Sequence, residues 1–204
     1  MRKFNSGKLV YGIGTKGLSY PVWDGKKLLK EYTVWSDMLR RCSSNFQLTK
    51  PTYNGVSCSE GFKSYSFFYE WCQEQIGFEN KDDKGRFWHL DKDLLVKGNK
   101  IYSEDTCVFV PPNINFLLTK RGNDRGDYPI GVSCSNKANK FKAQCNNGNG
   151  KIDHAGYFGT QEEAFQAYKA YKESLTKKIA NEYKLQLDPR AYQALMNYTV
   201  EITD

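Results

Sequence analysis

The sequence predicts an α+β fold in which an N-terminal helical and ββα unit precedes a three-stranded antiparallel sheet packed on one long helix. Three observations support this class. Apolar residues after Tyr32 recur at three- and four-residue steps, three short strand-like segments lie between residues 130 and 158, and a long segment with one apolar face follows Thr160. A chain of 204 residues is long enough for two small domains, each with its own core.

The N-terminal part is predicted to be mainly helical after a short extended start. Val10, Tyr11 and Ile13 are compatible with a short strand among glycines. Helical spacing then relates Trp35, Met38, Leu39 and Cys42, and a second helix is expected over residues 66–75. Arg40 and Arg41 lie beside the first apolar stripe, so we expect them to face solvent or phosphate.

The middle of the chain reads as strand, loop, strand and helix. A strand is expected over residues 87–95 and a second over residues 107–110, where Pro111 and Pro112 stop it. Residues 113–118 look like the opening of a helix. This order predicts a ββα unit at about residues 87–118.

The C-terminal part begins after a linker at residues 121–127. Strands are expected over residues 130–135, 140–146 and 154–158, and a helix then runs to about Tyr183. Thr160 and Glu163 have the spacing of a capping box at its start. A short helix beginning at Asp188-Pro189 and a final strand at residues 200–202 complete the chain. We therefore divide the chain into domains at residues 1–126 and 127–183, with an extension at 184–204.

Composition favours an intracellular protein that binds a polyanion. The formal net charge is +7, and each phosphate neutralised by Lys or Arg releases condensed counterions. No run approaches the roughly 18 apolar residues that span a bilayer, and the start has no apolar core of a signal peptide. The six cysteines form no CxxC pair, so we expect them to be reduced rather than to bind zinc.

The segment Lys140–Asn146 carries the strongest signal for nucleic acid. With a period of two, Phe141, Ala143 and Cys145 share the face toward the helix, and no acidic residue lies between Pro129 and Ile152. The opposite face has lysines for phosphates and amides for base edges. Including basic residues elsewhere, the expected DNA-binding residues are Arg40, Arg41, Lys137, Lys140, Lys142, Gln144, Asn146 and Lys151. The alternative is the solvated face of an ordinary α+β domain.

This region resembles the DNA-binding domain of plant ethylene-response transcription factors, which also occurs in phage nucleases. The resemblance covers about fifty residues and includes Gly131-Val132-Ser133, Phe141-Lys142-Ala143, Gly156-Tyr157-Phe158 and Thr160-Gln-Glu-Glu-Ala164 with Ala167-Tyr168. It implies a sheet that lies in the major groove with a helix behind it. The Arg- and Trp-rich strands that read GC-rich sites in the plant proteins are absent here, so the preferred base sequence stays open.

Most of the chain also resembles phage HNH-type endonucleases. The matching residues are Tyr32, Trp35, Met38, Leu39, Arg41 and Cys42, then Leu90-Asp91-Lys92-Asp93, Gly98-Asn99-Lys100, Tyr102-Ser103, and Cys107 to Asn115 with Phe109, Val110, Pro111 and Ile114. The resemblance implies one Mg²⁺ or Mn²⁺ per site. By position, Asp91 or Asp93 would be the strand ligand and Asn115 the helix ligand, with Asn113 as a neighbour that could serve instead.

The catalytic base is less directly implied. Thr106 stands where the family has its middle Asn, and the family's general-base His is not in its usual place. His89 and Lys92 are the candidates, beside Asp91, for the catalytic role. The alternatives are a half-buried His89 beside Trp88 without a catalytic task, and turn ion pairs of Asp91 and Asp93 with Lys92 or Lys97.

We therefore expect a divalent-metal-dependent endonuclease or nickase that hydrolyses phosphodiester bonds of double-stranded DNA. The alternatives are a catalytically inactive DNA-binding regulator of phage origin and an inhibitor of a host protein. The expected partner is double-stranded DNA rather than a membrane. The expected state is a monomer or weak dimer in the cytoplasm of the bacterial host.

Overall fold

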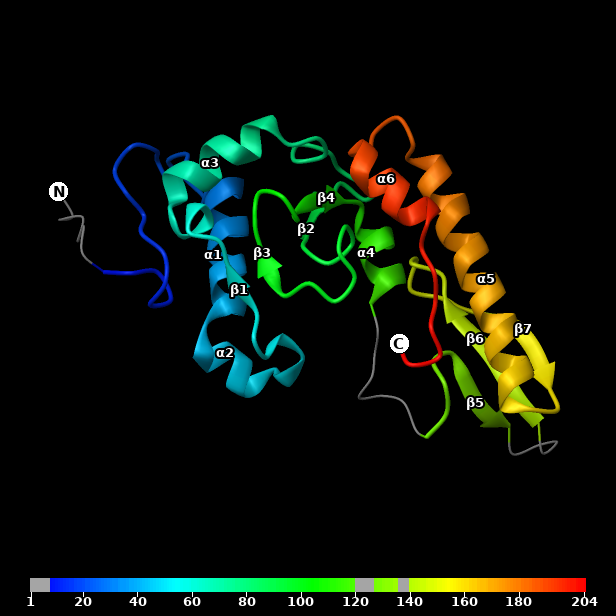
Figure 1. Ribbon diagram of the computed structural model, residues 1–204. Helices are drawn as coiled ribbons and strands as arrows, with labels where there is room; N and C mark the ends of the chain where they lie inside the picture. The colour runs from blue at the N-terminus through cyan, green and yellow to red at the C-terminus, as the bar shows by residue number, and fades with distance from the viewer. Residues whose placement is uncertain (1–7, 120–126, 136–139) are drawn as a thin grey trace. The chain divides into compact units, whose positions relative to one another are not determined.

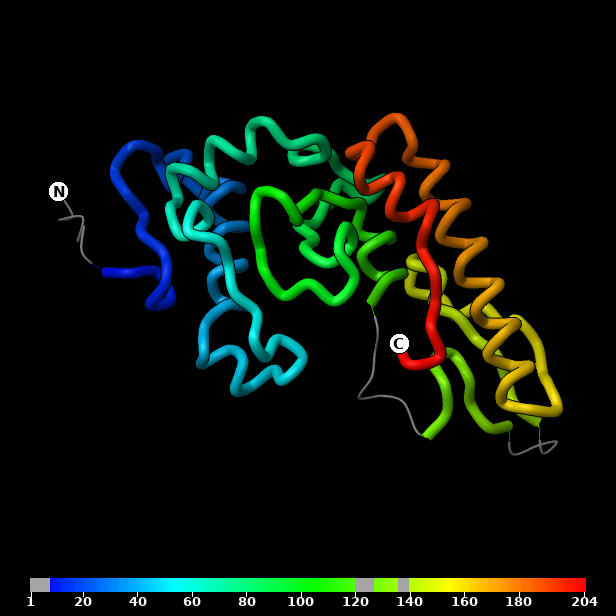
Figure 2. The backbone as a smooth tube through the Cα atoms, viewed as in Figure 1, coloured from blue at the N-terminus to red at the C-terminus, as the bar shows by residue number. Residues whose placement is uncertain are grey.

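The computed structural model describes residues 8–119, 127–135 and 140–204, and the path of the chain can be followed in Figures 1 and 2. The chain forms two compact units. Unit 1 comprises Met1–Glu79 and Leu90–Phe109, and unit 2 comprises Asn80–His89 and Val110–Asp204. The helix that begins at Pro112 and the C-terminal extension at residues 184–204 therefore belong to the same unit as the three-stranded sheet.

Unit 1 is built on helices with an aromatic core. Its helices are α1 (Lys30–Cys42), α2 (Ser44–Thr49) and α3 (Tyr65–Glu74), with short 3₁₀ turns at Pro51–Tyr53 and Gly61–Lys63. The helical spacing read from the sequence is confirmed for α1 and α3. Trp35 is fully buried and its indole Nε1 donates to the carbonyl of Phe62 at 2.8 Å, so the largest core side chain also has its polar atom satisfied.

The short strands around residues 57–110 form two small sheets. β1 (Ser57–Cys58) pairs in parallel with β3 (Ile101–Tyr102), and β2 (His89–Asp91) pairs with β4 (Val108–Val110). The helix α4 (Pro112–Leu118) follows β4, with a proline in its first turn, where a missing N–H costs nothing. The predicted order of strand, strand and helix is therefore present over this stretch.

Unit 2 holds the predicted antiparallel sheet in the order β5 (Val132–Ser135), β6 (Lys140–Asn146) and β7 (Ile152–Phe158). The long helix α5 (Gln161–Glu182) lies across one face of this sheet (Figure 1). Its predicted capping box is confirmed, because Thr160 Oγ1 accepts from the Glu163 N–H and the Glu163 carboxylate accepts from the Thr160 N–H. The sheet-on-helix architecture predicted from the sequence is thus the one observed.

The core of unit 2 lies between the sheet and α5. Its buried members are Val132, Ala143, Cys145, Ala164, Phe165, Tyr168 and Val200. Gly131 shows how closely helix and sheet approach: its φ is +77°, and an added Cβ would lie 2.1 Å from a ring carbon of Tyr168. Only glycine fits both the backbone conformation and the space.

A local cap begins one helix of unit 2, and a buried lysine joins two others. The helix α6 (Pro189–Met196) starts as predicted at Asp188, whose carboxylate accepts from the Arg190 N–H at 2.7 Å. Lys172 of α5 is only 4% exposed, and its ammonium donates to the carbonyl of Leu117 at the end of α4. Burial lowers the pKa of Lys172, and no carboxylate among the described residues forms an ion pair with it. The partner of this buried charge is therefore the carbonyl end of a helix.

Three local predictions were wrong. Val10 and Tyr11 enter a tight turn closed by a Val10–Gly14 bridge, and Tyr11 has φ +54°. Residues 200–202 form no strand, since Val200 is held instead by side chains of α5. The strand expected over residues 87–95 ends at Asp91, whose carboxylate accepts from the N–H groups of Asp93 and Leu94 and turns the chain.

Among the helices in the described part of the chain, none has the length and apolar character that crossing a membrane requires.

Candidate nucleic-acid interface

The two faces of β6 differ as the alternation of the sequence predicts. Ala143 and Cys145 are buried at 0% and 1% exposure against α5, and Phe141 packs against the same core. Lys140 is exposed, while Lys142, Gln144 and Asn146 are partly exposed on the opposite face. The expectation that the apolar residues of β6 face the helix is therefore confirmed.

Strand pairing extends this opposite face over the whole sheet. Ser133 pairs with Lys142, which pairs with Tyr157, so these three side chains form one row across the strands. We call the combined surface the outer face. It consists of Ser133, Ser135, Lys140, Lys142, Gln144, Asn146, Ile152, His154 and Tyr157.

A bulge in β7 decides which of its residues join the outer face. Gly156 pairs with Ala143 but His154 pairs with Gln144, so Ala155 is an extra residue in the strand. Without the bulge, His154 and Tyr157 would point to opposite faces. With it, both lie on the outer face, where Tyr157 is 57% exposed. Gly156 has φ +137°, a conformation reserved for glycine.

Sequence reasoning missed His154 and Tyr157 as surface residues because strict alternation separates them. A signal was present, since a glycine inside a strand often marks a bulge. Gly156 is that glycine.

The outer face carries positive charge without a carboxylate among the described residues. Asp153 of β7 lies on the inner face, where its carboxylate accepts from the hydroxyl of Tyr171 on α5 at 2.7 Å. This hydrogen bond to the carboxylate raises the pKa of Tyr171 to about 12. The acidic residue nearest to the two lysines in sequence is therefore turned toward the helix.

The side chains of the outer face are also available. Within the described residues, Lys140, Lys142, Gln144, His154 and Tyr157 make no side-chain hydrogen bond or ion pair. Asn146 differs, since its Nδ2 donates to the carbonyl of Phe116 at 3.3 Å and its Oδ1 accepts from the Gly148 N–H at 2.9 Å. Asn146 thus ties the end of β6 to α4 in addition to facing outward.

The remaining residues expected to bind DNA have separate settings. Lys151 is exposed in the turn between β6 and β7, and Lys137 lies outside the described residues. In unit 1, Arg40 and Arg41 both form ion pairs with Asp37, and Arg41 also donates to the hydroxyl of Tyr102 at 3.3 Å. These two guanidinium groups share one carboxylate within the protein, whereas the lysines of β6 have no ionic partner among the described residues.

In unit 2, the structure brings together His89 and Asn115. The His89 Nδ1 lies 2.9 Å from the Asn115 Nδ2, which links the start of β2 to α4. The ring of Phe116 meets the His89 ring edge-on at 5.8 Å between centroids. Asn113 is not part of this pair, because its amide donates to the hydroxyl of Tyr183 at 3.4 Å.

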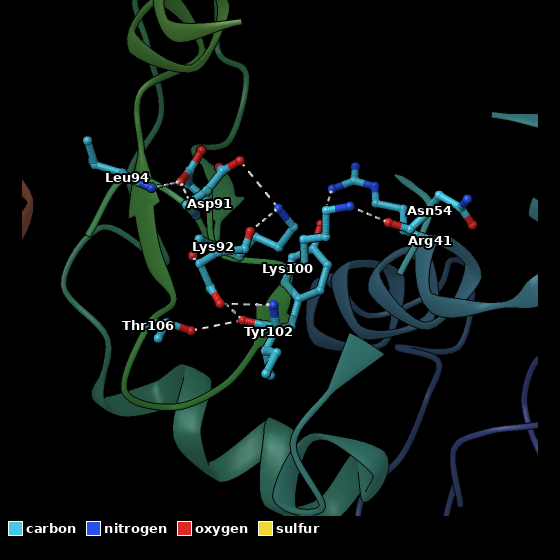
Figure 3. A network of polar contacts seen from close by, with 11 residues as sticks. Arg41, Asn54, Asp91, Lys92, Leu94, Lys100, Tyr102 and Thr106 are labelled. Carbon is cyan, nitrogen blue, oxygen red and sulfur yellow. Dashed lines mark hydrogen bonds and ion pairs between the residues drawn. The ribbon is translucent and has the colours of Figure 1, made fainter. Parts of the chain in front are cut away.

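In unit 1, Asp91, Lys92 and Asp93 form a turn with its own polar network (Figure 3). Asp91 is 8% exposed, and its Oδ1 accepts from the N–H of Asp93 at 3.0 Å and of Leu94 at 2.8 Å. Burial, followed by the charge of Asp93, raises the pKa of Asp91 to about 6. The carboxyl is therefore held by the turn and is harder to ionise than usual.

Lys92 is engaged in the same network. Its ammonium donates to the carbonyl of Asn99 at 2.9 Å and contacts the Asp93 carboxylate at 3.3 Å, and its side chain is 12% exposed (Figure 3). The Lys92–Asp93 contact matches the ion-paired turn that was the alternative for Asp93, whereas Asp91 is held by backbone N–H groups and forms no ion pair with a described residue. To act as a base, Lys92 would have to break its contacts with the Asn99 carbonyl and the Asp93 carboxylate.

Neither the His89–Asn115 pair nor the Asp91–Asp93 turn by itself provides the ligands that a divalent cation requires. His89 and Asn115 supply two neutral donors and no carboxylate, whereas Mg²⁺ requires anionic oxygen ligands. One carboxylate oxygen of Asp91 is used by the turn, and Asp93 faces Lys92. Across the described residues, no group of three or more His, Cys, Asp or Glu side chains is placed to hold a metal.

Comparison with protein families, with curated proteins and with solved structures gave no match for this chain.

Proposed function

We propose that this chain binds double-stranded DNA through the outer face of the β5–β6–β7 sheet. The observation that carries the proposal is a surface with Lys140 and Lys142, exposed amide and aromatic groups, and no described carboxylate, backed by α5. A twisted sheet of this kind has the chemistry of a groove reader. Lysines neutralise phosphates, and amides of Gln or Asn pair with adenine edges.

The alternative of an ordinary solvated face is less well supported by the same geometry. A solvated face needs mixed charges for solubility, whereas here the one acidic residue of β7 is bonded to α5. Strand pairing also places the exposed ring of Tyr157 beside Lys142, and the bulge at Ala155 adds His154 beside Gln144. Exposed Tyr next to Lys is typical of a surface that contacts bases and backbone together.

The binding proposal is tested with Lys142→Ala and Gln144→Ala in fluorescence anisotropy against duplex DNA. Each substitution should weaken binding by about five- to tenfold, because one phosphate contact or one base contact is lost. Melting temperatures should stay unchanged, since both side chains lie outside the core. Lys178→Ala on the exposed side of α5 is the matched control and should have a smaller effect. Unchanged affinity in both sheet variants would contradict the proposal.

A second candidate function is hydrolysis of the bound DNA, favoured by the pairing of His89 with Asn115. An Asn side chain that fixes one ring nitrogen orients the other toward a substrate. A base role requires the Asn115 amide to be turned so that its oxygen accepts from the His89 Nδ1–H. The Nε2 of His89 would then accept the proton of a water that attacks the phosphorus, while an oxygen of the phosphodiester departs. The resemblance to phage endonucleases supports this candidate, with the bacterial cytoplasm as location. The Mg²⁺ or Mn²⁺ that the resemblance also implies finds no complete ligand set among the described residues of either unit.

Nicking of supercoiled plasmid separates the two candidates. The assay compares Mg²⁺, Mn²⁺ and EDTA, with Asp91→Ala as a test of the implied metal ligand. His89→Ala and Asn115→Ala should lower the nicking rate by about 100-fold or more if the pair is catalytic. Gel shifts of the same proteins should stay unchanged, because neither residue lies on the outer face. Intact plasmid with wild-type protein that still shifts DNA would leave the non-catalytic DNA-binding protein as the function.

A further inference from the structure

A pocket of about 580 Å³ opens within unit 2, away from the core. Three segments line it: the turn with Lys84 and Arg86, the α4 residue Phe116, and the end of β6 with its turn, at Asn146, Gly148 and Asn149. Its volume lies in the range of pockets that hold small ligands, roughly 300–1,000 Å³.

The wall formed by the β6–β7 turn is fixed in place. Gly148 has φ +79°, and a Cβ there would lie 2.5 Å from the Asn113 carbonyl oxygen, so the turn packs directly on α4. Asn146 adds its two hydrogen bonds to Phe116 and Gly148. The turn is closed by the Asn147 N–H donating to the Lys151 carbonyl at 3.0 Å. The pocket is therefore preformed on this side.

The lining selects for an anion. It includes Lys84 and Arg86 and no carboxylate. Arg86 is paired with Asp82 at 2.5 Å, whereas Lys84 is exposed and forms no ion pair with a described residue. A phosphate here would meet an unneutralised ammonium and a guanidinium, the groups that bind phosphate in proteins.

The lining also offers a platform for a flat ring. Phe116 is 42% exposed, and the Arg86 guanidinium lies 5.9 Å from its ring centroid. Aromatic rings with adjacent cations stack nucleic-acid bases regardless of sequence. Asn149 also lines the pocket, and its amide can pair with a base edge.

We propose that this pocket accommodates a single nucleotide, with its phosphate at Lys84 and Arg86 and its base on Phe116. The source is either an unpaired nucleotide of a DNA strand or a free nucleoside monophosphate. For the DNA source, the inference rests on the proposed function, since Asn146 ends the strand that carries Lys142. Four residues of strand span about 13 Å, close to four base-pair steps of roughly 3.4 Å each. DNA lying along β6 would therefore reach the pocket.

The test measures binding to three probes by anisotropy or calorimetry: a short duplex with one unpaired thymidine, the same duplex fully paired, and thymidine 5′-monophosphate. Wild-type protein should prefer the duplex with the unpaired thymidine by about tenfold, because base stacking is added. Lys84→Glu and Phe116→Leu should reduce this ratio to about one. Lys178→Glu is the charge-matched control and should leave the ratio unchanged. Lys84 is exposed, so Lys84→Glu tests the pocket even if Phe116→Leu is poorly folded.

Each outcome has a definite meaning. Loss of the preference in the pocket variants supports a nucleotide of the DNA strand. Thymidine monophosphate binding that Lys84→Glu abolishes, without any duplex preference, supports the pocket with a free nucleotide as its ligand. An equal ratio in wild type and variants, with no monophosphate binding, overturns the inference. Failure of the DNA-binding proposal is visible separately, as absent affinity for the fully paired duplex.

Discussion

The outer face of the sheet in unit 2 and the Asp91–Asp93 turn in unit 1 both carry polar and charged side chains, but the two regions use them differently. On the outer face, Lys142 and Gln144 have no side-chain partner among the described residues. In the turn, the Asp91 carboxylate and the Lys92 ammonium are each held by backbone groups of their own unit. Polar side chains on a regular strand stay available to a ligand because the backbone groups beside them are paired within the sheet. Polar side chains in a tight turn instead form hydrogen bonds with the backbone groups that the turn leaves unpaired.

The largest expected effect tests whether the outer face depends on close packing behind it. Gly131→Ala should destabilise unit 2 by about 4 kcal/mol or prevent folding, because the added Cβ meets the Tyr168 ring at a positive φ. Gly150→Ala is the matched control: its φ is +80° but nothing lies within 4 Å, so about 1 kcal/mol is expected. Urea denaturation measures both. Equal losses would mean that backbone strain, not helix–sheet contact, sets the cost.

The next effect concerns the turn and depends on pH. The pKa of Asp91 is raised to about 6 in the folded protein from its ordinary value of 3.8, so folding favours the protonated carboxyl. The stability that this protonated group contributes is complete below pH 3.8 and is lost as the pH rises through 6. Asp91→Asn keeps the acceptor without the charge. It should therefore be more stable than wild type by about 2–3 kcal/mol at pH 8, with little difference at pH 4. A variant that is less stable at pH 8 would show that the ionised carboxylate has a favourable partner.

A smaller effect is expected on the outer face itself. Tyr157→Ala should weaken duplex DNA binding by about fivefold, because an exposed ring beside Lys142 is lost. Circular dichroism and melting temperature should be nearly unchanged. The comparison is sharpened with Phe158→Ala, whose ring packs on the inner side and whose loss should lower stability instead. If Tyr157→Ala binds DNA as wild type does, β7 is not part of the interface.

The smallest effect is expected for Arg40→Ala in unit 1. Arg40 is paired with Asp37 and its guanidinium lies 4.4 Å from the centroid of the Phe46 ring, so its removal should change DNA affinity by less than about twofold. The salt dependence of binding should also stay unchanged, in contrast to Lys142→Ala, which should lower the slope by about 0.9. A loss of DNA affinity comparable to that of Lys142→Ala would show that an ion-paired side chain in unit 1 contributes as much to binding as an unpaired lysine of β6.

Periodicity explains which parts of the fold were predictable. The 3.6-residue and 2-residue patterns located α1, α5 and the three strands of the sheet, and the Thr160–Glu163 spacing located a helix start. Each of these follows from interactions between residues close in sequence.

The parts that sequence reasoning missed depend on contacts between distant residues or on backbone geometry. The bulge at Ala155 re-registers β7 against β6, and no residue pattern alone places His154 beside Gln144. The backbone hydrogen bonds to Asp91 end a strand that its apolar neighbours would continue. The pocket beside Phe116 requires the packing of Gly148 on Asn113, two residues far apart in the chain.

The buried lysine of α5 has a consequence for mechanics. Because the Lys172 ammonium donates to the carbonyl of Leu117, the short helix that carries Asn115 and Phe116 is anchored to the helix behind the sheet. Bending or twisting of the sheet by a bound duplex would therefore be transmitted to α4 rather than absorbed in a flexible joint. Lys172→Met would keep the hydrophobic volume but remove this anchor, leaving the Asn146 hydrogen bond to the Phe116 carbonyl and the packing of Gly148 on Asn113 as links between the sheet and α4.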